Sequence, residues 1–247
     1  MIRAVLFDLD DTLVDHQHAS RAAIAGVRER FAVLQSRDVE DLVRENQRVL
    51  DSMHHEVAVG TRDVADARIE RYRRLFAFVG QGPERASAAA ELHRRIYQSS
   101  RQPVEGALEL VTLLHARLRV GVVTNNTLAE QQEKLSTFGF APHVDTLVTS
   151  EELGVAKPDA LMFQTALSRL QCEPYEAVMI GDAWVQDVLG ATGAGIRALW
   201  LNRQGLPHPD PAVAMQIASL HPAADIAMLV APDHALLARA FADGTGS

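Results

Sequence analysis

Two kinds of hydrophobic pattern divide the chain. Short apolar runs bounded by polar residues occur near the N-terminus, from Ile2 to the acids that begin at Asp8, and again throughout the second half of the sequence. Runs of this length predict strands that are buried on both faces. In the second half they alternate with segments in which apolar residues recur every three or four positions, as on one face of a helix. Strands are expected at residues 118–124, 144–149, 177–180 and 197–201, helices at 107–116, 127–139, 158–170 and 188–193, and a last helix and strand within 217–230.

The segment between the first strand and residue 103 has only the helical pattern. Alternating helices and strands form a parallel sheet covered by helices, and the first strand belongs in that sheet, so the helical segment is an insertion. The fold class predicted is α/β, a Rossmann-like parallel sheet core with an inserted all-helical domain. Helices of the insertion are expected at 23–34, 39–53, 65–79 and 83–96, with a loop at 54–62. The predicted domains are a core of residues 1–15 and 101–231, a helical domain of residues 16–100 and a C-terminal tail of residues 232–247.

Composition narrows the classes of function. With 247 residues, 47% of them hydrophobic, the chain can bury a full core, and no apolar run approaches the roughly 20 residues that a membrane helix needs. A net charge of −8 argues against nucleic-acid binding. The single cysteine, Cys172, excludes an internal disulfide framework and favours the reducing cytoplasm.

Charge is unevenly distributed along the sequence. Residues 16–102 contain 15 Arg and 12 acidic residues, a balance of +3, whereas the rest of the chain has a balance of −11. One interpretation is an anionic substrate met by arginines of the insertion and a cation held by acids of the core. The alternative is a set of solvated helix faces with ion pairs three or four residues apart, and this alternative is preferred for most individual arginines.

Acidic and polar residues follow the predicted strands where they end. Asp8 and Asp10, in Asp8-Leu9-Asp10-Asp11-Thr12, come directly after the first strand. If the strand continues past Asp8, the two carboxylates project to the same side and can flank one reacting group. Taken alone, the pattern also suits a strand end followed by an acidic turn.

Three later segments favour the chemical interpretation. Thr124 and Asn125 end the next strand and supply neutral hydrogen-bond donors near a helix start, and Lys157 comes before Pro158 as one of only two lysines. Gly181-Asp182, with Asp187 five residues on, follows another strand. Carboxyl ends of parallel strands meet at one edge of a sheet, where four converging carboxylates would repel one another unless a cation were present. Such oxygen ligands suit Mg²⁺.

These four segments, in this order and each at a strand end, resemble the motifs of the haloacid dehalogenase-like (HAD) superfamily of phosphohydrolases. The resemblance implies that Asp8 is a nucleophile that forms an aspartyl-phosphate and that Asp10 is the general acid and base. It implies that Thr124 and Lys157 hold phosphoryl oxygens, with Asn125 nearby in the substrate site. The ligands implied for Mg²⁺ are Asp8, the backbone carbonyl of Asp10, Asp182 and, through water, Asp187.

The helical insertion resembles the cap of the family's C1 subclass. The resemblance implies a small phosphorylated metabolite as substrate, chosen by cap loops, with Arg62 and Arg71 as candidate contacts beside His54, His55 and Gly60. A phosphosugar mutase would keep the same core residues and stays an alternative. The 2-haloacid dehalogenases lack the second acid of the first motif and need no metal, so that alternative is disfavoured, as is a non-catalytic phosphate-binding protein. The sequence gives no indication of oligomeric state.

Overall fold

The computed structural model places β1 (Ala4–Phe7) in the middle of a six-stranded sheet in which every pair of neighbours is parallel, in the order β3-β2-β1-β4-β5-β6. The order reverses direction between β1 and β4, and in open parallel sheets such a point opens a crevice at the carboxyl ends of the strands. The structure describes residues 1–58 and 61–232. The other strands are β2 (Arg119–Thr124), β3 (Thr146–Thr149), β4 (Ala177–Gly181), β5 (Arg197–Leu201) and β6 (Met215–Ile217).

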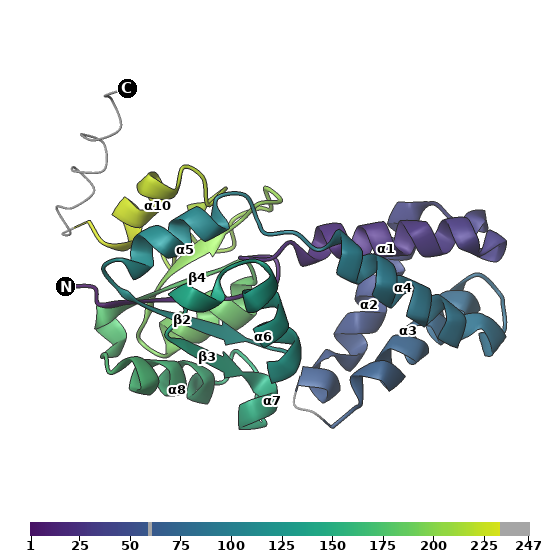
Figure 1. The fold of residues 1–247 in the computed structure, drawn as a ribbon, viewed down its shortest axis with the longest axis horizontal. Coiled ribbons are helices and arrows are strands. Elements are labelled where there is room, and N and C mark those ends of the chain that lie inside the picture. The colour runs from purple at the N-terminus through teal and green to yellow at the C-terminus, as the bar shows by residue number, and fades with distance from the viewer. Residues whose placement is uncertain (59–60, 233–247) are drawn as a thin grey trace. The chain divides into compact units, whose positions relative to one another are not determined.

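Residues of β1 alternate between two hydrophobic layers. Val5 and Phe7 pack in one layer with α5 (Ala107–His115) and α10 (Ala223–Val230), which lie side by side over one face of the sheet (Figure 1). Ala4 and Leu6 pack in the other layer with α8 (Ala160–Leu170). A strand covered on both faces is apolar throughout, which explains the uninterrupted run in the sequence. The other α-helices of the core are α6 (Leu128–Thr137), α7 (Ser150–Leu153) and α9 (Gly190–Gly193), and a π-helix over Trp184–Leu189 carries Asp187.

The chain forms two compact units. One unit consists of Met1–Val14 and Pro103–Ser247, here called the core unit, and the other, the helical unit, is Asp15–Gln102. The helical unit buries Tyr72 and Phe76 against apolar side chains of its other helices. Its helices are α1 (His16–Arg30), α2 (Val39–Ala58), α3 (Val64–Phe78) and α4 (Ala86–Ser100). None of the helices in the described part of the chain has both the length and the apolar character needed to span a bilayer.

The predicted α/β class with a parallel sheet is confirmed, and several predicted element boundaries are wrong. Helix α2 continues through residues 54–58, where a loop was expected, before the chain turns ahead of α3. Helix α8 begins at Ala160 with the Asp159 side chain as its cap, so Pro158 lies before the helix and not in its first turn. Near the C-terminus a strand precedes the last helix, the reverse of the predicted order. Of the predicted tail, residues 233–247 lie outside the described residues.

Candidate active site

Asp8 directly follows β1 and begins the site. Its N–H still donates to the carbonyl of Ile180 at 3.0 Å, so the edge of the sheet holds the backbone of Asp8 in place. The residue is 7% exposed, and its carboxylate accepts a hydrogen bond from Lys157 Nζ at 2.5 Å. Burial raises the pKa of Asp8 to about 7, with a further contribution from Asp187, although the charge of Lys157 works in the opposite direction. Asp8 is therefore a desolvated carboxylate with one cationic partner.

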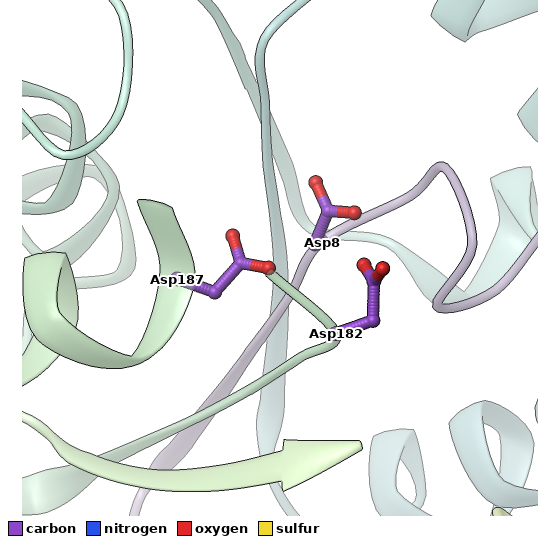
Figure 2. Close-up of side chains that lie close together, drawn as sticks. All are labelled: Asp8, Asp182 and Asp187. Carbon is purple, nitrogen blue, oxygen red and sulfur yellow. The ribbon is translucent and has the colours of Figure 1, made fainter. Parts of the chain in front are cut away.

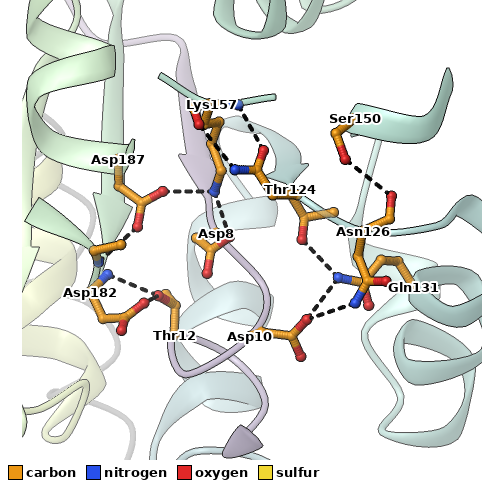
Figure 3. Close-up of polar contacts among 12 residues, drawn as sticks. Asp8, Asp10, Thr12, Thr124, Asn126, Gln131, Ser150, Lys157, Asp182 and Asp187 are labelled. Atoms are coloured by element: carbon orange, nitrogen blue, oxygen red, sulfur yellow. Dashed lines mark hydrogen bonds and ion pairs between the residues drawn. The ribbon is translucent and has the colours of Figure 1, made fainter. Parts of the chain in front are cut away.

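Lys157 joins two carboxylates. Its ammonium lies 2.5 Å from Asp8 Oδ1 and 2.6 Å from Asp187 Oδ1, and its side chain is 2% exposed (Figure 3). The two negative charges raise the pKa of Lys157 in spite of burial, so the amine stays protonated. Asn125 holds the loop of Lys157, since its side chain donates to the carbonyl of Lys157 and accepts from its N–H, at 3.1 and 2.7 Å.

Asp8, Asp182 and Asp187 bring their carboxylates together at the ends of β1 and β4 (Figure 2). One oxygen from each lies within 4.8 Å of the others. Burial raises the pKa of Asp182 to about 9, and repulsion from Asp8 and Asp187 adds to the effect. A cation among the three would offset that repulsion, and an all-oxygen donor set fits a hard divalent ion such as Mg²⁺.

Neighbouring groups hold Asp182 and Asp187 of this three-carboxylate cluster in place. The hydroxyl of Thr12 accepts from the N–H of Asp182 at 3.1 Å and donates to its Oδ1 at 3.3 Å. The indole of Trp200 donates to the carbonyl of Asp182 at 2.7 Å. Asp187 is fully buried, and the N–H of Ala183 donates to it at 3.0 Å. Thr12 and Trp200 had no predicted role, although Thr12 lies within the first motif.

The carboxylate of Asp10 points away from Asp8, toward residues of and near α6 (Figure 3). It accepts from Lys134 Nζ at 2.7 and 3.0 Å, from Gln131 Nε2 at 3.0 Å and from Asn126 Nδ2 at 3.3 Å. Both Lys134 and Gln131 are fully buried, and Gln131 also donates to the hydroxyl of Thr124 at 2.7 Å. The sequence motifs do not include these two residues. Their three-residue spacing on one helix face, after the Thr124 motif, was the available signal.

The two arginines predicted to contact substrate belong to the helical unit. Arg62 lies between α2 and α3 and pairs with Glu56 at 2.5 Å. Arg71 lies on α3 and is buried. The structure thus brings the residues of the four motifs to one edge of the sheet, while these two arginines belong to the other unit. The side chains of His54 and His55, and Gly60 itself, lie outside the described part of the structure.

Gly181 leaves no room for a side chain. A Cβ built on it would lie 2.5 Å from Cβ of Asp187 and closer still to the carboxylate. We expect Gly181→Ala to lower the thermal midpoint, because Asp187 is held by Lys157 and cannot move aside without losing that ion pair, and overpacking of this kind costs about 1–3 kcal/mol. Gly193→Ala is the matched control, since nothing lies within 4 Å of a Cβ built there. Equal midpoints for the two variants would contradict the close approach.

Comparisons with known proteins identify the family. A family model for haloacid dehalogenase-like hydrolases matches residues 2–195, a span that includes every carboxylate described above. The chain is 32% identical over 233 residues to a phosphoserine phosphatase of Thermus thermophilus, covering 85% of this chain and 92% of the relative. It is 29% identical over 215 residues to a glyceraldehyde 3-phosphate phosphatase of Methanothermobacter thermautotrophicus, covering 83% and 87%. Among solved structures, the HAD-hydrolase YfnB of Bacillus subtilis bound to magnesium matches with a TM-score of 0.72 at 23% identity, covering 92% of this chain and 98% of that one.

Proposed function

The chain belongs to the haloacid dehalogenase-like hydrolases as a phosphatase, and we propose that it hydrolyses the phosphate monoester of a small metabolite through an aspartyl-phosphate formed on Asp8. The observation that carries the proposal is the pairing of Asp8 with Lys157 beside Asp182 and Asp187. A buried carboxylate next to a fixed ammonium is suited to attack a phosphoryl group, because the cation offsets the negative charge that both partners bring together.

Asp8 supplies the nucleophile. One carboxylate oxygen attacks phosphorus, the bond between phosphorus and the ester oxygen breaks, and the phosphoryl group is transferred to Asp8. The ammonium of Lys157 already lies 2.5 Å from Asp8 Oδ1, so it is placed to stabilise charge on the phosphoryl oxygens during transfer. Asn125 acts as a positioning residue here, through its two hydrogen bonds to the backbone of Lys157.

Asp10 acts as the general acid and then as the general base. It gives a proton to the leaving oxygen and later takes one from the water that hydrolyses the aspartyl-phosphate. Between these two steps the carboxylate is ionised, and the ammonium of Lys134 stabilises that form. The hydrogen bond from Gln131 holds the side chain of Asp10 in place. To reach the leaving oxygen, the side chain of Asp10 turns from its position beside α6 toward Asp8.

Magnesium is the cofactor that we assign to the cluster of Asp8, Asp182 and Asp187. Asp8, Asp182 and the backbone carbonyl of Asp10 would hold the ion, with Asp187 acting through water. Bound there, Mg²⁺ supplies positive charge that neutralises the transferring phosphoryl group. The carboxylates of Asp8 and Asp182 bind a cation only when ionised, so the site favours the ion most at alkaline pH.

The substrate is assigned to the class of small phosphorylated metabolites. Two relatives are a phosphoserine phosphatase and a glyceraldehyde 3-phosphate phosphatase, and the names of both refer to small phosphate-bearing molecules. We assign the choice of leaving group to the helical unit, with Arg62 and Arg71 as candidate contacts, and we place the enzyme in the cytoplasm. The hydrogen-bonded second acid, Asp10, favours a phosphatase over a 2-haloacid dehalogenase, which has no leaving-group oxygen to protonate.

The proposed activity is tested by phosphate release from a panel of phosphorylated metabolites, with and without Mg²⁺. We expect free phosphate from several members, most rapidly from one chemical class, and none after the metal is removed with a chelator. Chromatography of the same reactions separates hydrolysis from isomerisation, since a mutase would return a phosphorylated isomer. No phosphate release from any ester would refute the proposal.

Magnesium is also expected to stabilise the fold. Three neighbouring carboxylates repel one another without a cation, and binding to the native state alone at 100 times the Kd contributes about 2.7 kcal/mol. The measurement is the unfolding midpoint during a magnesium titration. In the double variant Asp182→Ala, Asp187→Ala the shift is expected to disappear. A double variant that responds to Mg²⁺ as the wild type does would place the ion elsewhere.

A further inference from the structure

Eight arginines of the helical unit form ion pairs that the structure describes, and Arg71 is not one of them. Its side chain is buried, at 6% exposure, and its Nε has no hydrogen-bond partner among the residues that the structure describes. No acidic side chain among the described residues pairs with it, and its guanidinium lies over the ring of Tyr72, with Cζ 5.7 Å from the ring centroid. The other pairs are Arg21–Glu40, Arg44–Asp41, Arg48–Glu45, Arg62–Glu56, Arg73–Glu70, Arg74–Glu70, Arg94–Glu91 and Arg95–Glu91.

In the described part of the chain, the groups whose charges act on the pKa of Arg71 are Tyr72, Tyr97 and Arg68, and none of them is a carboxylate. The hydroxyl of Tyr72 and Nδ1 of His93 are 2.8 Å apart, and the ring of His93 stacks on Tyr97 with centroids 6.2 Å apart. The hydroxyl of Tyr97 is in turn 2.9 Å from Nδ1 of His16. This chain of contacts runs from the interior, at Arg71 and His93, to the half-exposed Tyr97 and His16.

The charge state of these groups leaves the cluster positive. Burial, and then the charges of Arg71 and His16, hold the pKa of His93 well below its usual range, so the imidazole is neutral. Burial raises the pKa of Tyr72, so its hydroxyl also stays neutral. Burial lowers the pKa of Arg71 as well, but a guanidinium remains protonated in proteins. A buried guanidinium with no counter-charge is unfavourable unless an anion binds to it.

We propose that α3 and α4 of the helical unit form a binding site for a small carboxylate, centred on the guanidinium of Arg71. A carboxylate fits better than a phosphate, because one guanidinium offers two parallel N–H groups and a single positive charge, whereas a phosphate dianion calls for more donors and charge. The unpartnered Nε–H belongs to one such pair of donors. Tyr97 and His16 give the site its polar opening.

The carboxylate comes from one of two sources. It is part of the substrate's leaving group, in which case the inference rests on the proposed phosphatase function, or it belongs to a separate small molecule. Kinetic measurements test the first source. Equilibrium binding to an inactive variant tests the site whether or not the proposed function is correct.

The kinetic experiment uses two esters that differ only in the carboxylate, 3-phosphoglycerate and glycerol 3-phosphate. For the wild type we expect a higher kcat/KM with 3-phosphoglycerate. Arg71→Met is expected to lower that value at least about tenfold through KM, with little change for glycerol 3-phosphate, since a charge-assisted bidentate contact is lost. Arg71→Lys keeps the positive charge but loses the two parallel N–H groups, so its kcat/KM with 3-phosphoglycerate is expected to lie between those of the wild type and Arg71→Met. Arg74→Met is the matched control on the same helix, since Arg74 is half-exposed and paired with Glu70.

The binding experiment uses the full chain with Asp8→Asn and measures glycerate and glycerol by calorimetry. Binding of glycerate but not glycerol, lost with Arg71→Met and kept with Arg74→Met, supports the site. If this occurs without any kinetic preference, the carboxylate belongs to a separate molecule. If Arg71→Met does not fold, Arg71→Lys takes its place, with glycerate expected to bind several-fold more weakly. Equal affinity for glycerate in the Arg71 and Arg74 variants, or no glycerate binding to the parent, would overturn the proposal.

Discussion

Replacing Asp8 with Asn is expected to abolish turnover and leave the fold intact. An amide is not a competent nucleophile toward phosphorus, and loss of a nucleophile lowers kcat by about 10⁴-fold or more. Asn has the same shape, and the charge that it removes is one that burial already disfavours, as the raised pKa of about 7 shows. The measurements are the rate of phosphate release and the thermal midpoint without Mg²⁺, which should stay close to that of the wild type because Lys157 keeps its ion pair with Asp187.

Asp11→Asn is the control for this variant. Asp11 is an acid three residues along the same loop, and its φ of 65° is one that Asn adopts readily. The control is expected to keep its rate within about tenfold, because Asp11 forms no part of the carboxylate group around Asp8. Turnover by Asp8→Asn close to that of the wild type, in protein free of host phosphatase, would refute the covalent mechanism.

The central strand and the residues at its end could be predicted from the sequence, because burial of the strand in the sheet leaves a direct mark on the local pattern of apolar and polar residues. A strand buried on both faces must be apolar throughout, and polar residues can begin only where it leaves the sheet, as at Asp8. The same reasoning placed Thr124 at the end of β2 and Asp182 just beyond the end of β4. Register then aligns these strand ends, since Phe7 pairs with both Val122 and Ile180.

The surroundings of Asp10 could not be read in the same way. Its cationic partner, Lys134, is 124 positions away in sequence and reaches it only because α6 packs beside the sheet edge. Lys134 also pairs with Glu130 at 3.1 Å, one turn earlier, which is the pattern of an ordinary surface helix pair. Its complete burial depends on tertiary packing, which helical periodicity does not report.

The two arginines predicted to contact the substrate differ in burial, which the sequence does not show. The sequence predicts the same role for Arg62 and Arg71, yet Arg62 is half-buried with an acidic partner, whereas Arg71 is almost fully buried and has no acidic partner among the described residues. Arg71 precedes Tyr72, whose side chain faces the core of the helical unit. Neighbouring positions on a helix differ in direction by about 100°, so which part of Arg71 is covered depends on how α4 packs.

Replacing Lys157 with Met is expected to lower both activity and stability. Loss of a fixed donor at the transferring phosphoryl group costs about 10²- to 10³-fold in rate. Met has a similar length but leaves Asp8 and Asp187 buried without their common cation, and breaking a buried pair in this way costs about 3–5 kcal/mol.

The stability loss in Lys157→Met should depend on pH in a definite direction. Lys157 lowers the pKa of Asp8, which burial nevertheless raises to about 7, so removing the lysine raises that pKa further. A carboxyl group with a raised native pKa keeps its proton while the unfolded chain releases one, and the free energy of unfolding therefore falls as pH rises from about 4 through the native pKa. In the variant this fall continues to higher pH than in the wild type. Denaturant unfolding without metal should show a larger difference between the two proteins at pH 8 than at pH 5.

Lys134→Met separates this effect from the general loss of a buried lysine. Both lysines are buried against carboxylates, but Lys134 pairs with Asp10 and Glu130, whereas Lys157 pairs with two members of the group that could hold a metal. Mg²⁺ at high concentration should therefore restore much of the stability lost in Lys157→Met, because a cation among Asp8, Asp182 and Asp187 replaces the missing charge. Lys134→Met keeps the three carboxylates, so Mg²⁺ should stabilise it only as much as it stabilises the wild type, and its deficit relative to the wild type at the same Mg²⁺ concentration should not shrink. Equal recovery of both variants would show that the ion stabilises the protein at a site unrelated to Lys157.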